Sequence, residues 1–427
     1  MKLVVTAEHH FVRSPDGTHW GPDSMTYRFW ERYLDVFDRV SVVVRVRNVD
    51  RVSAEFTRAD GPGATIRGMP EYTGPREYLR VRREFQRAAA NATGPDDAVL
   101  LRVGCSPLAA AVESELGKRN QPFGVEVITD PYMVFAPGAI RHPLRPAFRR
   151  MYTRQLQRQC TNAVAATYVT RAALQERYPA GATTFVTSYS DVDLPPQALV
   201  DRGRSGELRG SVPTVVSIGS MAQLYKGFDV LIDAIARCAQ RGLNVNLILV
   251  GDGKHRPELE HQVRQLGLQR QVTFTGQLAG GTAVRTELDK ADLFVLASRT
   301  EGLPRAIIEA QARALPCLGT RIGGIPELLD ETCLVRPDDA EDLAESMLAM
   351  MRDPIRRAFE SERNLTAART FSQSEIAARR LTFLRELRDR TCVELPRRSL
   401  IPPSTSQSLQ SRSLVSSAGH RPEGADQ

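Results

Sequence analysis

The strongest constraint on the fold is the segment that begins at residue 291. The apolar run Ala291-Asp-Leu-Phe-Val-Leu-Ala-Ser298 is typical of a strand that is buried on both faces of a parallel sheet. A short loop follows, and Pro304 then suits the first turn of a helix because its missing N–H needs no partner there. The segment therefore predicts a strand, a loop and a helix of an open α/β sheet, which binds ligands beyond the carboxyl ends of its strands.

Two carboxylates accompany the predicted helix start. Glu301 lies in the loop and Glu309 lies in the helix. The free N–H groups of residues 302–305 and the positive end of the helix dipole favour an anion. Carboxylates accept hydrogen bonds from vicinal hydroxyls while the amides hold a diphosphate, so the arrangement would suit a sugar nucleotide. The alternative is that Glu301 is a helix-start carboxylate and Glu309 a solvated helix residue.

The flanking sequence extends this pattern. Strand, loop and helix segments follow one another at residues 214–235, 247–253, 272–276 and 323–327. In this order they resemble the C-terminal domain of the retaining glycosyltransferases of group 1, also called glycosyltransferase family 4. The resemblance covers roughly residues 212–390 and includes the two glutamates separated by seven residues. It implies the GT-B fold, in which two Rossmann-like doubly wound α/β domains face each other across a cleft.

The resemblance also implies a role for each matching residue. Glu301 would contact the transferred sugar, and Glu309 would hold the ribose hydroxyls. Lys226 would bind the diphosphate and stabilise charge on the leaving oxygen. The nucleobase is expected near residues 272–276. The remaining donor-binding positions would be Gly219, Ser220, Gly251, Phe274, Gly302, Leu303 and Pro304.

One position departs from the family pattern. Members of the family often carry an arginine directly after the glycine of the first loop, but here Ser220 follows Gly219. A guanidinium makes a bidentate phosphate contact that a serine cannot replace. Either Arg299 or Arg305 takes over this contact, or diphosphate binding depends on Lys226 and the helix end.

The predicted domain organisation follows from the two halves of the chain. Alternating strands and helices in the first half predict a second doubly wound unit, with strands near residues 40–46, 97–103, 123–130 and 163–170. The resulting division is an acceptor-binding domain at residues 1–195, a nucleotide-sugar-binding domain at 196–370, a helix at 371–393 that crosses back to the first domain, and a disordered tail at 394–427.

Two features of the first domain concern the acceptor. Residues 8–20 are predicted to form a loop after the first strand, and His9, His10 and Arg13 in it are candidates for acceptor contacts. An exposed loop with incidental histidines is the alternative. Family members commonly present a histidine or an acidic residue near the end of the third strand toward the transferred sugar. Asp130 is the candidate for that position, since the usual histidine is absent.

Composition narrows the class of protein. The length of 427 residues suggests roughly two to three domains, and no apolar run is long enough to cross a membrane. The N-terminal apolar stretch is too short for a signal peptide, and six scattered cysteines are typical of reduced thiols. We therefore expect a cytoplasmic enzyme. No Asp-x-Asp cluster appears in the donor region, so neither a metal nor a cofactor beyond the nucleotide-sugar is expected.

A basic stretch suggests a partner. Residues 141–158 contain six arginines and no acidic residue, and residues 76–87 add five arginines against two glutamates. This charge could face an anionic membrane, at the inner side of the cell membrane, in which case the acceptor could be a lipid-linked sugar. A solvated helix face is the plainer interpretation. Nucleic acid is disfavoured because no recognition motif accompanies the charge.

The sequence thus predicts a glycosyltransferase of bacterial cell-surface polysaccharide or glycolipid assembly. Retention of configuration is implied by the family alone, and the two glutamates are not expected to act as the acid and base of a glycosidase. The alternatives are a non-catalytic nucleotide-sugar-binding subunit, and an epimerase or a phosphorylase of the same fold. A nicotinamide-binding protein is disfavoured because no Gly-x-Gly-x-x-Gly follows the first strand.

Overall fold

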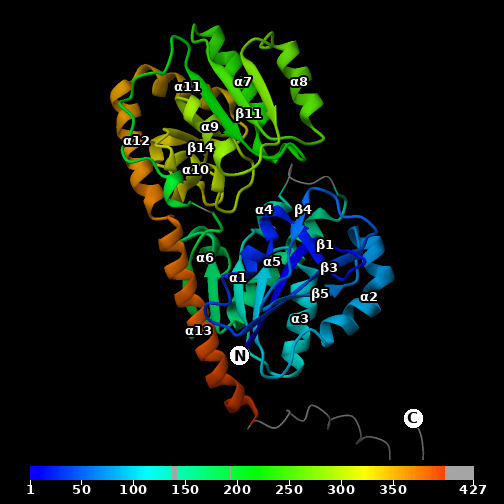
Figure 1. Ribbon diagram of the computed structural model, residues 1–427. Helices are drawn as coiled ribbons and strands as arrows, with labels where there is room; N and C mark the ends of the chain where they lie inside the picture. Colours follow the sequence, from blue (N-terminus) through cyan, green and yellow to red (C-terminus); the bar gives the residue numbers. More distant parts are fainter. Residues whose placement is uncertain (137–141, 193, 400–427) are drawn as a thin grey trace, which may run out of the picture.

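The computed structural model describes residues 1–136, 142–192 and 194–399, which form two α/β domains joined along one long C-terminal helix (Figure 1). The N-terminal sheet ends near residue 188 and the C-terminal sheet begins at residue 214. Each domain has a largely parallel sheet with helices on both faces, as the sequence predicted.

The N-terminal sheet is built around a parallel core with strand order β5-β3-β1-β6-β7-β8-β9. Its strands are β1 (Lys2–Arg13), β2 (His19–Pro22), β3 (Arg39–Asn48), β4 (Phe56–Arg58), β5 (Ala64–Met69), β6 (Ala98–Val103), β7 (Gly124–Val127), β8 (Ala165–Tyr168) and β9 (Phe185–Ser188). The helices are α1 (Tyr27–Glu31), α2 (Gly74–Ala90), α3 (Pro107–Lys118), α4 (Pro131–Val134), α5 (Arg145–Asn162) and α6 (Ala173–Arg177). The strand order reverses between β1 and β6, which is the point where such sheets bind ligands.

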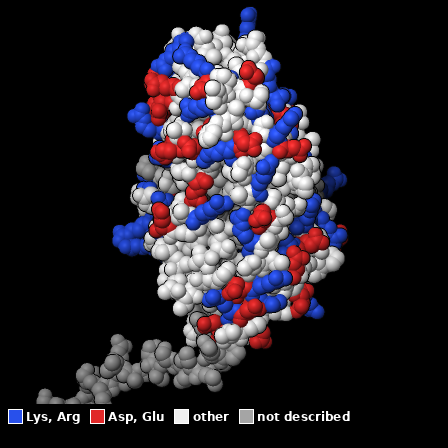
Figure 2. Space-filling model, turned by 90° about the vertical axis from the view of Figure 1, so that its left-hand side faces the viewer, with Lys and Arg blue, Asp and Glu red and all other residues white. Residues whose placement is uncertain are grey.

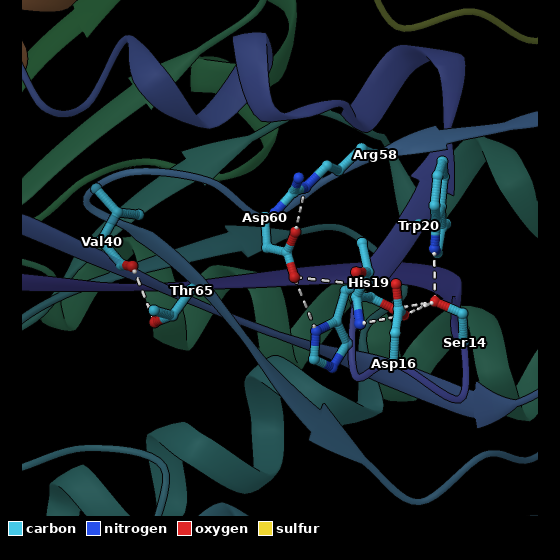
Figure 3. A network of polar contacts seen from close by, with 9 residues as sticks. Ser14, Asp16, His19, Trp20, Val40, Arg58, Asp60 and Thr65 are labelled. Carbon is cyan, nitrogen blue, oxygen red and sulfur yellow. Dashed lines mark hydrogen bonds and ion pairs between the residues drawn. The ribbon is translucent and has the colours of Figure 1, made fainter.

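The prediction of a loop at residues 8–20 was wrong. β1 continues through Arg13 and returns as an antiparallel hairpin into β2, with Val12 opposite Trp20. Figure 3 shows what closes this hairpin: the Trp20 indole donates a hydrogen bond to the Ser14 hydroxyl at 3.0 Å, and the Asp60 carboxylate accepts from the His19 backbone N–H at 3.0 Å. Polar residues dominate this segment, so its sequence gave no strand signal. Pairing with β3 and β4 supplies the strand instead.

The C-terminal sheet has the order β12-β11-β10-β13-β14-β15, and its pairs are parallel. Its strands are β10 (Thr214–Ile218), β11 (Asn246–Val250), β12 (Val272–Gly276), β13 (Leu293–Leu296), β14 (Cys317–Thr320) and β15 (Leu334–Val335). The helices are α7 (Phe228–Gln240), α8 (Arg256–Gln265), α9 (Thr282–Lys290), α10 (Arg305–Ala312), α11 (Ala340–Arg352) and α12 (Pro354–Arg369). All four residues of β13 are buried, as its apolar run predicted, and the strand order reverses between β10 and β13.

The last helix, α13 (Gln373–Ser399), runs from the C-terminal domain along the N-terminal domain (Figure 1). Phe383, Leu384 and Leu387 are buried on its inner face. A Cβ added to Gly124 in β7 would lie 2.8 Å from a methyl carbon of Leu387, so the missing side chain at Gly124 is what lets helix and sheet approach. The helix is longer than the predicted 371–393, because residues 394–399 are helical where the tail was expected to begin. Residues 400–427 lie outside the described part of the chain.

Candidate functional site

The loops after β10 and β13 meet where the strand order reverses. Lys226, in the loop after β10, extends its Nζ to 2.6 Å from Oε1 of Glu301, in the loop after β13. The Ser298 hydroxyl donates to the same carboxylate oxygen at 2.6 Å. Both partners of the ion pair are mostly buried, with 16% and 8% of the Lys226 and Glu301 side chains exposed. The structure therefore brings together the two residues that the sequence singled out for the chemistry.

Two glycines place Lys226. A Cβ on Gly219 would lie 2.8 Å from Cγ of Lys226, so the lysine can lie along the loop only because residue 219 has no side chain. Gly227 has a φ of +67°, and a Cβ there would lie 1.9 Å from the carbonyl oxygen of Ala297. A non-glycine residue at either position would displace the lysine or the strand beside it.

Ser220 does not replace the family arginine. It is exposed, and its hydroxyl accepts a hydrogen bond from the Ala222 N–H at 3.2 Å. Arg299 is not available either, because its guanidinium makes a bidentate ion pair with Asp229 at 2.8 and 2.7 Å and donates to the Leu224 carbonyl oxygen at 2.6 Å. Arg299 thus holds the loop that carries Lys226. The exposed Arg305 makes no hydrogen bond or ion pair within the described residues, so it remains the candidate phosphate clamp.

The start of α10 differs in detail from the prediction. The helix begins at Arg305, and Pro304 is its extended N-cap residue and not its first helical residue. Gly302 accepts a hydrogen bond from the Gly324 N–H at 2.7 Å through its carbonyl oxygen. Within the described residues, the N–H groups of Gly302 and Leu303 have no hydrogen-bond acceptor, which leaves them able to bind an anion. Glu309 lies half-buried in the same helix.

The loops after β11 and β12 complete this side of the site. Gly251 follows β11 with a φ of +136°, and its N–H donates to the Gly276 carbonyl oxygen at 3.0 Å. A Cβ on Gly251 would lie 1.9 Å from the carbonyl oxygen of Gly219, so the two loops are in direct backbone contact. Phe274 is half-buried in β12, with the Arg256 guanidinium 5.7 Å from its ring centroid.

An interdomain cleft of about 720 Å³ lies next to this donor-side loop. Its C-terminal wall includes Leu303 and Arg305, and Arg380 of α13 also lines it. The N-terminal wall includes His9, Arg28, Arg32, Arg102, Ile128 and Asp191. The domains nearly touch here, since a Cβ on Gly302 would lie 3.4 Å from the Ile128 carbonyl oxygen. A ligand that spans both domains would therefore meet Leu303 and the N-terminal sheet together.

Buried charges form the floor of the cleft. The Arg102 guanidinium, which is 2% exposed, lies 2.6 Å from Oε2 of Glu126 and 2.6 Å from Oδ2 of Asp191. Arg32 contacts the other oxygen of Asp191 at 3.2 Å. Although burial opposes it, attraction to Arg102 and Arg32 lowers the pKa of Asp191 below its usual range. The only local sign of this network in the sequence is a charged residue within each of the apolar strands β6 and β7.

Of the three acceptor-side candidates, His9 alone lines the cleft. The pairing of β1 with β3 shifts register between Thr6 and His10, and this irregularity contains His9. Burial and then the nearby Arg102 and Arg45 lower the pKa of His9 to about 4. His10 is instead ion-paired to Glu71, and Arg13 is an exposed residue at the end of β1.

Asp130 makes several structural contacts, and its predicted contact with the transferred sugar stays a prediction. It is 4% exposed and is not among the residues that line the cleft. Its carboxylate caps α4 by accepting from the Tyr132 N–H at 2.9 Å, accepts from the Tyr178 hydroxyl at 2.5 Å, and forms an ion pair with Arg177. Each carboxylate oxygen thus has a partner within the N-terminal domain, and burial limits the access of a substrate hydroxyl to it.

Comparison with known proteins identifies the domain that carries Lys226 and Glu301. Residues 212–353 match the family described as "Glycosyl transferases group 1". This part of the chain is therefore similar to the domains of group 1 glycosyltransferases. Protein CapJ of Staphylococcus aureus is 27% identical over 320 residues, which cover 74% of this chain and 78% of CapJ. The Vi polysaccharide biosynthesis protein VipC/TviE of Salmonella typhi is 35% identical, over 28% of this chain and 22% of that protein.

Solved structures confirm the fold across both domains. Sucrose-phosphate synthase from Thermosynechococcus elongatus is 18% identical with a TM-score of 0.66, covering 91% of this chain and all of that one. Anabaena Alr3699/HepE, solved in complex with UDP and glucose, is 17% identical with a TM-score of 0.60, covering 90% and 99% of the two chains. The family domain and the names of the relatives identify a glycosyltransferase, and the neighbours confirm two Rossmann-like domains.

Within residues 1–136, 142–192 and 194–399, no helix combines the length and the apolar character that a membrane span requires. The same residues contain no group of three or more His, Cys, Asp or Glu side chains arranged to hold a metal ion.

Proposed function

We propose that the protein transfers a glycosyl group from a nucleotide diphosphate-sugar to an acceptor hydroxyl, with retention of configuration, in the assembly of a bacterial surface polysaccharide or glycolipid. The observation that carries this proposal is the Lys226–Glu301 pair beside the N–H groups of Gly302 and Leu303. UDP and glucose bound by Alr3699/HepE, and the polysaccharide named in VipC/TviE, support it.

The chemistry follows from where charge develops. When the bond from the anomeric carbon to the diphosphate oxygen breaks, the electron pair leaves with the diphosphate. The Lys226 ammonium and the start of α10 neutralise that charge, so no proton needs to be transferred to the leaving group. Glu301 accepts hydrogen bonds from the sugar, and Glu309 from the ribose. A metal is not required, because the cation of Lys226 and the amides supply the neutralisation.

The acceptor occupies the interdomain cleft in this proposal. Because the pKa of His9 lies near 4, its imidazole is neutral at pH 7 and can accept or donate a hydrogen bond to a hydroxyl without adding charge. Arg28, Arg305 and Arg380 line the same cleft and make no ion pair within the described residues. They give the cleft a net positive wall that suits an acceptor with a negatively charged group.

The first experiment is a thermal-shift screen against UDP, GDP, ADP and their sugar conjugates without added metal. One nucleotide is expected to stabilise the protein, and the shift should be lost in Glu309→Ala. In transfer assays with that donor, Glu309→Ala should raise the donor KM, whereas Lys226→Ala should lower kcat by on the order of 10²–10³-fold. Wild-type kinetics in both variants would overturn the site assignment.

The missing family arginine can be tested directly. If Arg305 is the second phosphate contact, Arg305→Ala should weaken donor binding, and adding Ser220→Arg should restore it. Arg264→Ala, at an exposed position of α8, is the matched control. Failure of Ser220→Arg to restore binding would remove Arg305 from the donor site and assign it to the acceptor side of the cleft.

A non-catalytic nucleotide-sugar-binding subunit is the second candidate function. It is favoured by one observation: Arg299 is fully used by Asp229, so neither it nor Ser220 provides the family phosphate clamp. Donor binding without hydrolysis or transfer, for many acceptors, would establish this alternative. Release of an epimerised sugar nucleotide in the absence of acceptor would instead indicate an epimerase.

The proposal also includes peripheral contact with the anionic inner face of the cell membrane. Within the basic stretch, Arg145, Arg149 and Arg158 bind the Phe135 carbonyl, the Tyr132 carbonyl and Glu113. Arg150 and Arg154 are exposed and make no ion pair within the described residues, and Arg141 lies outside them. The part of the stretch available to a membrane is therefore the outer face of α5.

A further inference from the structure

The N-terminal domain contains a second, larger hollow that the proposed chemistry does not use. This groove, between α2, α3 and α5, has a volume of about 1030 Å³, at the upper end of the range for ligand pockets. Its walls are mainly apolar and aromatic; they include Tyr72, Tyr78, Phe135, Phe148, Met151 and Tyr152. Small side chains at Ala110 and Ala111 of α3 form part of its surface and leave the space open.

The aromatic walls are packed against one another and hold the groove in shape. The rings of Phe135 and Tyr152 stack with centroids 5.6 Å apart and an interplanar angle of 4°. Tyr72 and Tyr78 contact edge to face at 5.1 Å on the other side. Met151, which also lines the groove, leaves 48% of its surface exposed. Such exposed apolar area in a hollow is typical of a binding site for an apolar ligand.

Positive charge surrounds this apolar groove. The five arginines of α2, at positions 76, 80, 82, 83 and 87, are all exposed, and their guanidinium groups make no hydrogen bond or ion pair within the described residues. Arg83 and Arg87 lie at the rim, whereas Lys118 of α3, also at the groove, is paired with Glu115 at 2.6 Å. By contrast, Figure 2 shows the face along α12 and α13, where basic and acidic side chains alternate. An apolar hollow with a cationic rim complements an amphiphile with a hydrocarbon chain and an anionic head.

The groove also adjoins the interdomain cleft. Ile128 lines the cleft and Phe135 lines the groove, with only α4 and its flanking residues between them in the chain. On the other side, the Tyr72 hydroxyl in the groove donates to the Glu8 carboxylate at 3.3 Å, and the next residue, His9, lines the cleft. A single elongated molecule could therefore lie with its hydrocarbon chain in the groove and its charged head among the arginines of α2, and extend a sugar from that head toward the cleft.

We propose that this groove binds the hydrocarbon chain of an anionic, lipid-linked acceptor, whose charged head is held by the arginines of α2. This site deepens the function proposed above, because it specifies the class of acceptor. It is a built pocket for the chain, and so differs from contact of a basic surface with bulk membrane lipid. Lipid binding at the groove does not depend on turnover, so the two proposals fail separately.

The direct test is binding of dodecyl phosphate, with inorganic phosphate and dodecanol as head-only and tail-only probes. The wild type should bind dodecyl phosphate more tightly than either probe. Ala111→Trp should fill the groove and weaken binding by about tenfold or more, whereas Ala147→Trp, at an exposed position of α5 outside the groove, should not. Arg83→Glu with Arg87→Glu should also weaken it, whereas Arg264→Glu with Arg270→Glu in the C-terminal domain should not.

Two outcomes would overturn the proposal. Unchanged dodecyl phosphate affinity in a folded Ala111→Trp protein, verified by its thermal unfolding, would show that the chain binds elsewhere. Flotation with phosphatidylcholine vesicles, with and without phosphatidylglycerol, tests whether the groove binds bulk membrane lipid instead of a lipid-linked acceptor. If Ala111→Trp weakens vesicle binding as much as dodecyl phosphate binding, the groove holds bulk membrane lipid. Retention of the nucleotide-induced thermal shift in Ala111→Trp separates either result from a failure of the donor site.

Discussion

The two sides of the interdomain cleft are built by different means. On the C-terminal side, Lys226 and Glu301 are placed by short loops whose shape depends on glycines in close backbone contact. On the N-terminal side, Arg102, Glu126 and Asp191 are placed by a buried network of ion pairs. Each loop of the first side can be recognised from consecutive residues, although Lys226 and Glu301 lie 75 residues apart in the chain. The second side is assembled from separate strands. Short local motifs therefore mark the C-terminal side of the cleft, whereas long-range charge pairing forms the N-terminal side.

The largest expected effect tests the charged network. Arg102→Ala should lower the free energy of unfolding by about 3–5 kcal/mol, because it leaves the buried Glu126 and the partly buried Asp191 without their shared cation. Arg102→Met with Glu126→Gln should lose less, since it removes charge from both partners. Urea unfolding measures both values. A loss below about 1 kcal/mol for Arg102→Ala would mean that the network is not what holds this side together.

A substitution at a glycine of the C-terminal side should instead lower kcat. Gly219→Ala places a Cβ 2.8 Å from Cγ of Lys226, so the ammonium should move from its place beside Glu301. We expect kcat to fall on the order of 10- to 10²-fold, with a small change in thermal stability. Gly280→Ala is the control, because nothing lies within 4 Å of its added Cβ. Equal kcat values in the two variants would contradict the role of Gly219.

A substitution at Asp130 tests whether the N-terminal domain supplies the acidic residue predicted to contact the transferred sugar. Because Asp130 caps α4 and binds Tyr178 and Arg177, Asp130→Ala should cost roughly 1–2 kcal/mol of stability. The donor KM and kcat, measured well below the unfolding temperature, should stay within about twofold of the wild-type values. A large fall in kcat without loss of stability would restore Asp130 to the catalytic site.

The smallest effect concerns pH. The folded-state pKa of His9, about 4, lies below its ordinary value of 6.5, so the unfolded chain takes up the proton first. The contribution of neutral His9 to stability is therefore complete above about pH 6.5 and is lost as the pH falls toward 4. His9→Gln should show a smaller decrease in unfolding temperature between neutral and acidic buffers. His261→Gln, at an exposed position of α8, is the control. An unchanged pH dependence in His9→Gln would place the acid sensitivity in another group.

Several errors in the sequence-based predictions have one physical cause. The predicted loop at residues 8–20 became a strand because β3 and β4 pair with it, and Arg299 was taken by Asp229, 70 residues away in the chain. Pro304 moved by one position because caps are decided by backbone geometry. The errors at residues 8–20 and at Arg299 involve a partner outside the local segment, which local propensity does not register.

The sequence alone determined the separate segments of the C-terminal side. The apolar run of β13, the glycines on either side of Lys226 and the spacing of the two glutamates all act within short segments, so their structure follows from local pattern and backbone sterics. Only the tertiary structure decided the cleft floor and the groove. Arg102 and Asp191 are 89 residues apart, and the groove needs three helices to pack around a space that no single helix pattern encodes. Charge pairing and enclosed volume are properties of the assembled domain, because both depend on distances that only folding sets.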